Sequence, residues 1–488
     1  MQTTQKRSFN LIPHKLSAWR WLLPLLAILT GSLVSLLSQQ VLLVMLVLLV
    51  GLPLAGLVIS QHTRQTAVVL LLALVPLVGI LKALTGSRFA PLTFDLGLLL
   101  ALALFVLADL LRGKIRIGHL DMLWLAFLIL AFLQMFNPNV PTLQAGVEGF
   151  RKFAFMSIAF YMGRHMLREK DRRLLVHLLL LVSVPVTLYG LKQFFFISAL
   201  DLRVIDLATS GVTTYLMGGW IRPFSTTPGP FHLGLYLLTV LLLLIALLID
   251  KQTKPRFRLV LTGVIALQLT VLIMTRTKGN WIGLIIGVII LALLQVRHSP
   301  KAFIRLFGLI LLGALVIGAI VLAASDIAQS VVQDAIFAVT HPAQAPTFIY
   351  RLSLWQDTML PAISHHPLLG YGTSSAGEGL ANLYQNNASL YFPSHNLYLK
   401  VFLELGLFGL LVFLTIIMLS LRRGWRLRKR HEEFNPTDRI IWQWSFAVIV
   451  AFLVAGIVIP TLDAYPPNYY FWLLLGIFSS GWASKAKT

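Results

Sequence analysis

The chain has 488 residues, of which 57% are hydrophobic and only 12% are charged. Soluble domains carry about twice that charged fraction, so a soluble globular protein is excluded. A net charge of +22 would suggest nucleic-acid binding in a soluble chain. In a membrane protein Lys and Arg instead mark cytoplasmic loops, so no nucleic-acid partner is expected. The sequence has no cysteine, which rules out disulfides and thiolate chemistry.

Apolar runs recur along the sequence, and most have the roughly 18 or more residues needed to cross a bilayer. Because lipid offers no hydrogen-bond partners, each such run predicts a helix. The first run, 19–37, is too long for a signal-peptide core and is interpreted as a retained span. The predicted fold is therefore an all-α, polytopic transmembrane bundle of about 14 spans. The predicted spans are 19–37, 41–60, 66–84, 92–111, 120–136, 152–167, 174–199, 228–249, 258–275, 279–296, 303–324, 396–421, 440–460 and 467–484.

The hydrophilic joints between these spans alternate in charge. Basic joints such as RHMLREKDRR and RRGWRLRKRHEE are separated by joints that carry few charges. With both termini in the cytoplasm, about 29 of the 40 Lys and Arg lie on the cytoplasmic side, as the positive-inside rule requires. The longest joint, 325–395, then lies outside. Within it we expect an interfacial amphipathic helix over 325–339 and turns around HHPLLGYGTSSAGEG.

Basic residues at outward helix ends contradict this charge bias and need a reason. One alternative is that each side chain snorkels to lipid headgroups of the outer leaflet. Only about eight Asp and Glu are expected on that side, which favours an anionic ligand over carboxylate partners. A diphosphate fits best, because the arginine fork matches phosphate oxygens. The candidate phosphate-binding residues are Arg222, Arg276, Lys278 and Arg351.

His395 stands at the outward end of the predicted span 396–421. A water-exposed helix-end histidine is the simpler interpretation. However, Asn396, Lys400 and Glu404 follow it at a spacing of four residues, which places them on one helical face. We expect Lys400 and Glu404 to pair in the outer half of the span, where charged residues are functional candidates. A neutral histidine beside a phosphate-binding pocket can act as a base, which predicts transfer from a phosphate leaving group to a hydroxyl.

Other chemistries fit the sequence less well. It contains no Asp-x-Asp pair, no glycine-rich phosphate loop and no His-x₃-His spacing, so neither a metal site nor a cofactor is expected. The adjacent pair His365 and His366 would point in different directions in regular structure, and we interpret it as part of a turn.

The stretch YRLSLWQDTMLPAISHHPLLGYG, followed by PSHNLYLKVFLELGLFGLLVFL, resembles the core of the O-antigen ligase and Wzy-type polymerase superfamily. Upstream, TRTKGNWIGLIIG and WIRPFSTTPGPFHLG resemble two further elements of that core, so the resemblance covers roughly 220–415. The seven predicted N-terminal spans carry no recognisable motif. The matching residues are Arg351, Trp355, Pro367, Gly370, Gly372, His395, Asn396, Tyr398, Leu399, Glu404, Gly406 and Gly409.

The sequence departs from the family pattern at two places. Lys278 stands where the family has Arg, and Arg276 lies two residues earlier, so either one could contact phosphate. The family's Asn after Pro is replaced near Phe231 and His232, and we assign no role to that position.

The resemblance implies a metal-independent, inverting glycosyltransferase of the GT-C type in the bacterial inner membrane. Its donor would be a glycan on undecaprenyl diphosphate, presented on the outer face. His395 would be the base, the four cations would bind the diphosphate, and Asn396, Lys400 and Glu404 would support the site. The expected organisation is N-terminal helices over 1–219, a core over 220–421 and C-terminal helices over 422–488.

Three functions remain open. A polymerase would use a lipid-linked glycan as acceptor and a ligase would use lipid A core, and the element RPFSTTPGP slightly favours the polymerase. A flippase for lipid-linked oligosaccharides is the alternative from another class, but paired repeats and broken helices, typical of transporters, are not recognised. Membrane lipids and a chain-length regulator are further expected partners.

Overall fold

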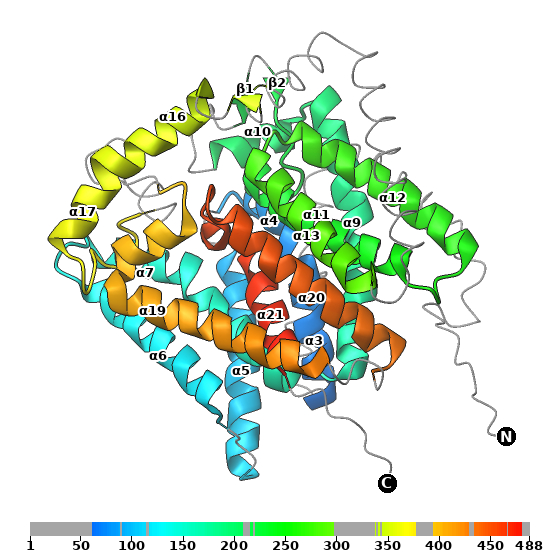
Figure 1. Cartoon of the computed structure of the whole chain (residues 1–488), viewed down its shortest axis with the longest axis horizontal. Helices are drawn as coiled ribbons and strands as arrows, with labels where there is room; N and C mark the ends of the chain where they lie inside the picture. The colour runs from blue at the N-terminus through cyan, green and yellow to red at the C-terminus, as the bar shows by residue number, and fades with distance from the viewer. Residues whose placement is uncertain are drawn as a thin grey trace.

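The computed structural model describes residues 61–87, 90–113, 117–207, 215–217, 220–296, 337, 340–341, 344–376, 394–428, 434–465 and 467–480. Within these residues, eight helices are long and apolar enough to cross a membrane, which confirms an all-α, polytopic membrane protein (Figure 1). The predicted spans 19–37, 41–60 and 303–324 and almost all of the predicted amphipathic helix 325–339 lie outside the described residues.

The first half of the described chain is a series of helices joined by short turns. Short 3₁₀ helices and one π helix interrupt or end the α-helices. These elements are α3 (Gln61–Leu74), η2 (Val75–Leu77), α4 (Val78–Thr85), α5 (Leu92–Leu111), α6 (His119–Leu133), η3 (Gln134–Phe136), α7 (Leu143–Phe153), η4 (Phe155–Ser157), α8 (Ile158–Tyr161), η5 (Met162–Met166), α9 (Glu169–Phe195) and α10 (Ala199–Asp206).

The second half begins with a two-stranded antiparallel hairpin and continues in helices. The strands are β1 (Leu216–Met217) and β2 (Trp220–Ile221). The helices are α11 (Pro230–Ile249), α12 (Pro255–Met274), α13 (Lys278–Val296), α16 (Pro346–Ser353), η8 (Leu354–Met359), α17 (Leu360–His365), α19 (Leu397–Arg426), α20 (Pro436–Ala455), η11 (Thr461–Asp463) and α21 (Asn468–Ser479).

Most predicted spans correspond to one of these helices, but 152–167 does not. It consists of the end of α7 followed by the short turns η4, α8 and η5. This segment packs closely against α21, where a Cβ on Gly476 would lie 2.1 Å from the Phe160 carbonyl oxygen. The last predicted span, 467–484, is also shorter than expected, because α21 ends at Ser479.

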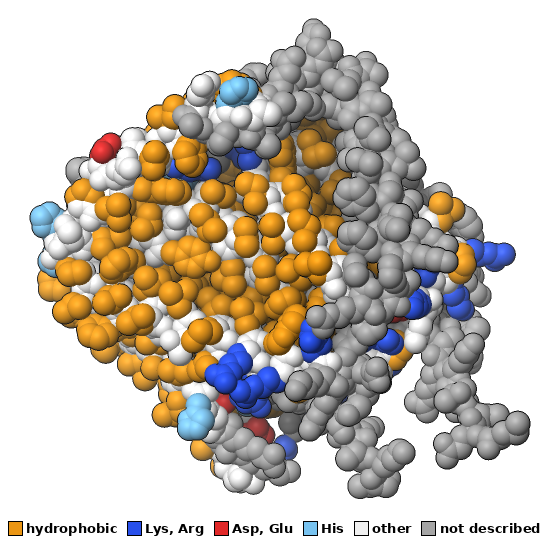
Figure 2. All heavy atoms as spheres, viewed as in Figure 1, with side chains coloured by type: hydrophobic (Ala, Val, Ile, Leu, Met, Phe, Trp, Pro, Cys, Tyr) orange, Lys and Arg blue, Asp and Glu red, His pale blue; other side chains and the backbone are white. Residues whose placement is uncertain are grey.

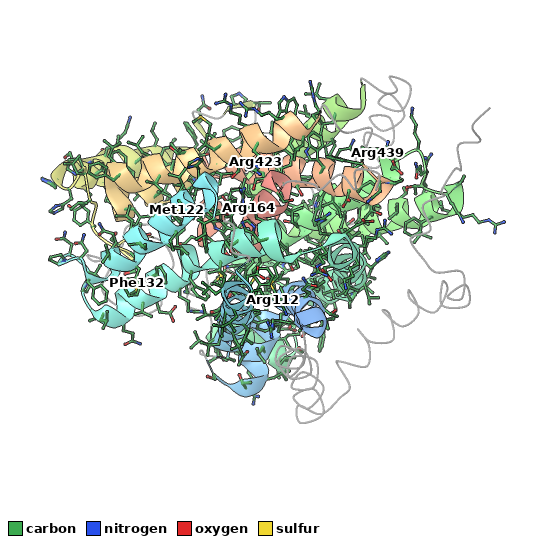
Figure 3. All side chains as sticks on the ribbon, turned by 90° about the horizontal axis from the view of Figure 1, so that it is seen from below. Arg112, Met122, Phe132, Arg164, Arg423 and Arg439 are labelled. Atoms are coloured by element: carbon green, nitrogen blue, oxygen red, sulfur yellow. The ribbon has the colours of Figure 1, made fainter. Side chains whose placement is uncertain are left out.

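The bundle has two chemically different ends. At one end Asp121, in the first turn of α6, forms an ion pair with Arg164 at 2.9 Å and a hydrogen bond with His165 at 2.8 Å. Figure 3 labels Arg112, Arg164, Arg423 and Arg439 as seen from this side. Figure 2 shows a broad hydrophobic face between this basic edge and a few Lys and Arg below the opposite rim. The opposite end carries β1, β2, α10 and α16 (Figure 1), and we call it the site end.

Helix α19 is broken within its length at Gly406, whose φ is 67° and ψ −171°. The segment 367–372 fills the break: the Tyr371 and Gly372 amides donate to carbonyls of α19 at 2.8 and 3.0 Å. In return, Leu407 donates its amide to the Pro367 carbonyl at 2.9 Å. A break inside a membrane helix is tolerated where protein satisfies the freed backbone groups. The turns expected around HHPLLGYG are confirmed. The break in α19 was not predicted from the sequence.

Candidate active site

Arg351 and His395 come together although 43 residues and a helix start separate them in sequence. The segment α16–η8 docks onto the chain before α19, because Trp355 Nε1 donates a hydrogen bond to the Ser394 carbonyl at 2.8 Å. The ring of Tyr350 lies 6.0 Å from the His395 ring, measured between centroids. Two residues of the predicted site therefore meet at the start of α19.

The electrostatics of this pair keep the histidine neutral. Burial lowers the pKa of His395, and the positive charge of Arg351 lowers it further, to about 4. Burial also lowers the pKa of Arg351, and no carboxylate of the described residues pairs with it. At neutral pH the imidazole can accept a proton, and the guanidinium is available to an anion.

The backbone at His395 is also unusual. Its φ is 43°, in the left-handed region that non-glycine residues seldom occupy. The next residue, Asn396, caps α19, since its side-chain oxygen accepts from the Tyr398 and Leu399 amides at 2.8 and 3.0 Å. The predicted supporting residue Asn396 is thus the N-cap of the helix that carries the base.

A second pair of cations meets where the loop after β2, which carries Arg222, contacts the turn between α12 and α13, which carries Arg276. Arg222 Nε donates a hydrogen bond to the Thr275 carbonyl at 2.8 Å. Burial and the neighbouring charge of Arg276 lower the pKa of Arg222 to about 10. Arg276 itself has a φ of 52°, so it shares the left-handed backbone of His395. Such strained residues concentrate at functional sites.

The turn after α20 joins the two pairs. The Leu397 amide donates to the Gly456 carbonyl at 2.7 Å, and Asn396 Nδ2 donates to the Ile457 carbonyl at 2.9 Å. On its other side the turn contacts the first turn of α13, where a Cβ on Gly279 would lie 2.9 Å from side-chain carbons of Ile459. Lys278, the first residue of α13, and His395 therefore lie on either side of one turn.

The loop that carries Arg222 is held by residues that sequence reasoning missed. Gln193 Oε1 accepts from the Phe224 and Ser225 amides at 3.0 and 2.5 Å. Asp201 accepts from Gln193 at 2.7 Å and forms an ion pair with Lys192 at 2.6 Å. In the sequence these residues are an ordinary polar helix end, and only the tertiary contacts show their role.

Lys400 and Glu404 form the predicted pair, with 2.6 Å between Nζ and Oε1 and almost no exposure. Asp463 lies 3.6 Å from Lys400 Nζ and was not predicted. Glu404 Oε1 also accepts from the Ser374 and Ala376 amides at 3.1 and 3.2 Å. The pair thus ties the segment 372–376 of the long joint to α19.

The N-terminal helices, which carried no recognisable motif, also hold this joint. Gln134 Nε2 donates to the Leu369 carbonyl at 2.8 Å, and Asn137 Nδ2 donates to the Gly370 carbonyl at 3.1 Å. Thr373 donates its hydroxyl to the Gly146 carbonyl at 3.0 Å. In the sequence, the polar turn FNPNVP at the end of the predicted span 120–136 was the signal that could have indicated this contact with the long joint.

The sequence that carries this site is similar to a known protein family. Residues 263–414 match the family described as O-antigen ligase. The chain carries an O-antigen ligase domain. This confirms the resemblance seen in the sequence, although the matched region is shorter than the expected 220–415. No curated protein matches the chain.

The O-antigen ligase domain begins in α12 and ends in α19, and Arg276, Lys278, Arg351 and His395 all lie within it. Arg222 lies outside it. The domain indicates an O-antigen ligase- or polymerase-type membrane enzyme, glycosyltransferase-like, that acts on lipid-linked glycan and acceptor substrates in polysaccharide biosynthesis. The domain boundaries expected at 219/220 and 421/422 stay predictions.

Proposed function

We propose that this protein transfers a glycan en bloc from an undecaprenyl-diphosphate-linked donor to an acceptor hydroxyl, without a metal ion and with inversion at the anomeric carbon. The observation that carries the proposal is the neutral His395 beside Arg351 at the start of α19. The Arg222–Arg276 pair, at the same end of the bundle, adds positive charge for a diphosphate.

In the proposed reaction the acceptor hydroxyl attacks the anomeric carbon of the donor sugar. Its oxygen forms the new glycosidic bond, its proton passes to His395, and the bond from the anomeric carbon to the diphosphate oxygen breaks. The leaving diphosphate takes that electron pair, and Arg351 with Arg276 or Lys278 stabilises the charge, assisted by Arg222.

Donor binding would correct the low basicity of the histidine. A base with a pKa of about 4 is weak at neutral pH. A diphosphate bound to Arg351 would offset the positive charge that helps to lower this pKa. The pKa of His395 should therefore be higher in the donor complex than in the free protein, closer to the value that suits a general base.

The proposed orientation follows from the charges of the two ends. The end that carries Arg112, Arg164 and Arg423 would face the cytoplasm, together with both termini, in the bacterial inner membrane. The site end would face outward, where a lipid-linked donor is presented.

Two alternatives differ in the acceptor or in the class of activity. A ligase would use lipid A core in place of a second lipid-linked glycan, and the element RPFSTTPGP is the reason for preferring the polymerase. A flippase is favoured by one observation, the broken helix α19, since discontinuous helices are common in transporters.

A transfer assay in liposomes tests the proposal. Purified protein is given lipid-linked glycan extracted from its native membranes, and products are separated by size with and without EDTA. Longer glycans at an unchanged rate in EDTA are expected. Movement of the glycan across the bilayer without a new glycosidic bond would establish the flippase instead, and loss of activity in EDTA restored by a divalent ion would refute the metal-free reaction.

A further inference from the structure

One exposed aromatic side chain lies beside the candidate base and has no place in the mechanism above. Tyr350 immediately precedes Arg351 on α16, and 54% of its surface is exposed. Its ring and the His395 ring are 6.0 Å apart and inclined at 67°. The tyrosine thus lies beside the candidate base, and directly before Arg351 in the chain, while more than half of its surface remains open.

The position of the Tyr350 ring limits which part of a substrate can contact it. The reacting hydroxyl must come within about 3 Å of a His395 nitrogen for its proton to be transferred. The donor sugar must lie between that hydroxyl and the diphosphate at Arg351. The Tyr350 ring, 6.0 Å from the imidazole, is therefore within contact distance of a pyranose in either the acceptor or the donor position.

We propose that Tyr350 is a sugar-binding platform, on which the pyranose ring of a glycan substrate stacks at the candidate active site. The C–H face of a pyranose is apolar and matches an aromatic ring, while the phenol hydroxyl can bond a sugar hydroxyl. Such a platform would hold the glycan in reacting geometry against His395. This inference rests on the proposed function, because it takes the substrate to be a glycan.

A tyrosine on an interfacial helix could instead anchor α16 to lipid headgroups. The contact with His395 favours the sugar, because a lipid anchor has no reason to face the base. Phe348 provides a matched control: it lies on the same helix, is 39% exposed, and is two residues away, so it faces a different side.

The kinetic test compares Tyr350→Ala, Tyr350→Trp and Phe348→Ala in the liposome transfer assay. The donor and acceptor concentrations are varied separately. Tyr350→Ala should raise one KM about two- to tenfold, the range for one aromatic contact, with little change in kcat. A higher donor KM identifies the donor glycan as the stacked sugar, and a higher acceptor KM the acceptor glycan. Tyr350→Trp and Phe348→Ala should stay near wild type. Unchanged KM values in Tyr350→Ala, or equal losses in Phe348→Ala, would overturn the platform.

A binding measurement keeps this test separate from the proposed reaction. Saturation-transfer NMR on the purified protein, with methyl glycosides of glucose, galactose, mannose and rhamnose, reports contact without turnover. We expect transfer to the ring C–H protons of at least one glycoside in wild type and Tyr350→Trp, and loss in Tyr350→Ala. Equal saturation in wild type and Tyr350→Ala would refute the platform even if transfer activity is found. Conversely, Tyr350-dependent saturation without transfer activity would refute the proposed reaction and leave the sugar site standing.

Discussion

Arg351 lies close enough to His395 for its charge to act on the imidazole, and burial together with this charge lowers the pKa of His395 to about 4. The cation that would bind the leaving group therefore also controls the base. Because kcat/KM reports the free enzyme and kcat the substrate complex, the two should respond differently to pH.

The first prediction concerns this pH dependence. The acid limb of kcat/KM should lie near pH 4, because His395 is neutral above that value in the free protein. The limb of kcat should lie at higher pH, since bound diphosphate offsets the charge of Arg351. Arg351→Gln should move the kcat/KM limb upward, because a neutral neighbour no longer disfavours the imidazolium. Arg351→Lys keeps the charge and should leave the limb in place. Identical limbs in all three proteins would show that another group titrates.

Replacing the base should abolish transfer without unfolding the protein. His395→Ala is expected to lower kcat by about 10²–10⁴, the usual contribution of a positioned general base, with little change in donor binding. The measurement is single-turnover transfer, with donor affinity and thermal unfolding determined in parallel. Near-normal turnover by this variant would exclude His395 as the base.

Arg351 should contribute to donor binding as well as to the rate. Arg351→Ala is expected to weaken donor affinity and slow transfer, because it removes a charge contact present in both the ground state and the transition state. Arg351→Lys should recover only part of the loss, since a lysine cannot bind two phosphate oxygens with a planar fork. Titration with lipid-linked donor measures the affinity; full recovery by lysine would argue against a bidentate contact.

The buried Lys400–Glu404 pair should be a stability element. Lys400→Met leaves Glu404 and Asp463 without their shared cation, and breaking a buried pair in this way costs about 3–5 kcal/mol. Adding Glu404→Gln removes one uncompensated charge, so the double variant should unfold at a higher temperature than Lys400→Met alone. Thermal unfolding in one detergent provides the comparison. Additive losses would mean that the two side chains act independently.

The break in α19 should require glycine at position 406. Gly406→Ala meets both a left-handed φ of 67° and the Leu368 carbonyl oxygen at 2.1 Å from the new Cβ. Gly86→Ala isolates the backbone strain, because its φ is 65° and no atom lies within 4 Å. Gly263→Ala, in open space on α12, provides a helical control. We expect the yield of folded protein to fall most for Gly406→Ala and not for Gly263→Ala. For Gly86→Ala we expect a modest fall, because the left-handed backbone alone costs about 1–2 kcal/mol of stability. Equal yields for the first two would mean that segment 367–372 does not need the break.

Composition, hydropathy and charge placement are enough to predict the all-α membrane architecture and to select the residues of the candidate site. Long apolar runs have one solution in lipid, so most spans could be predicted without tertiary information. Arg276, Lys278 and Arg351 could be singled out because basic residues at predicted outward helix ends contradict the topology bias, and His395 because polar and charged residues follow it on one helical face.

How these residues meet depends on contacts between segments that are distant in the chain. The break at Gly406 depends on hydrogen bonds to segment 367–372, more than 30 residues earlier, and no local pattern encodes such a partner. The low pKa of the His395 ring likewise depends on burial and on Arg351 of α16, which lies more than 40 residues earlier in the chain. Hydrophobic periodicity is a local property, whereas burial and charge proximity arise from contacts between distant segments; the spans could therefore be predicted and the state of the base could not.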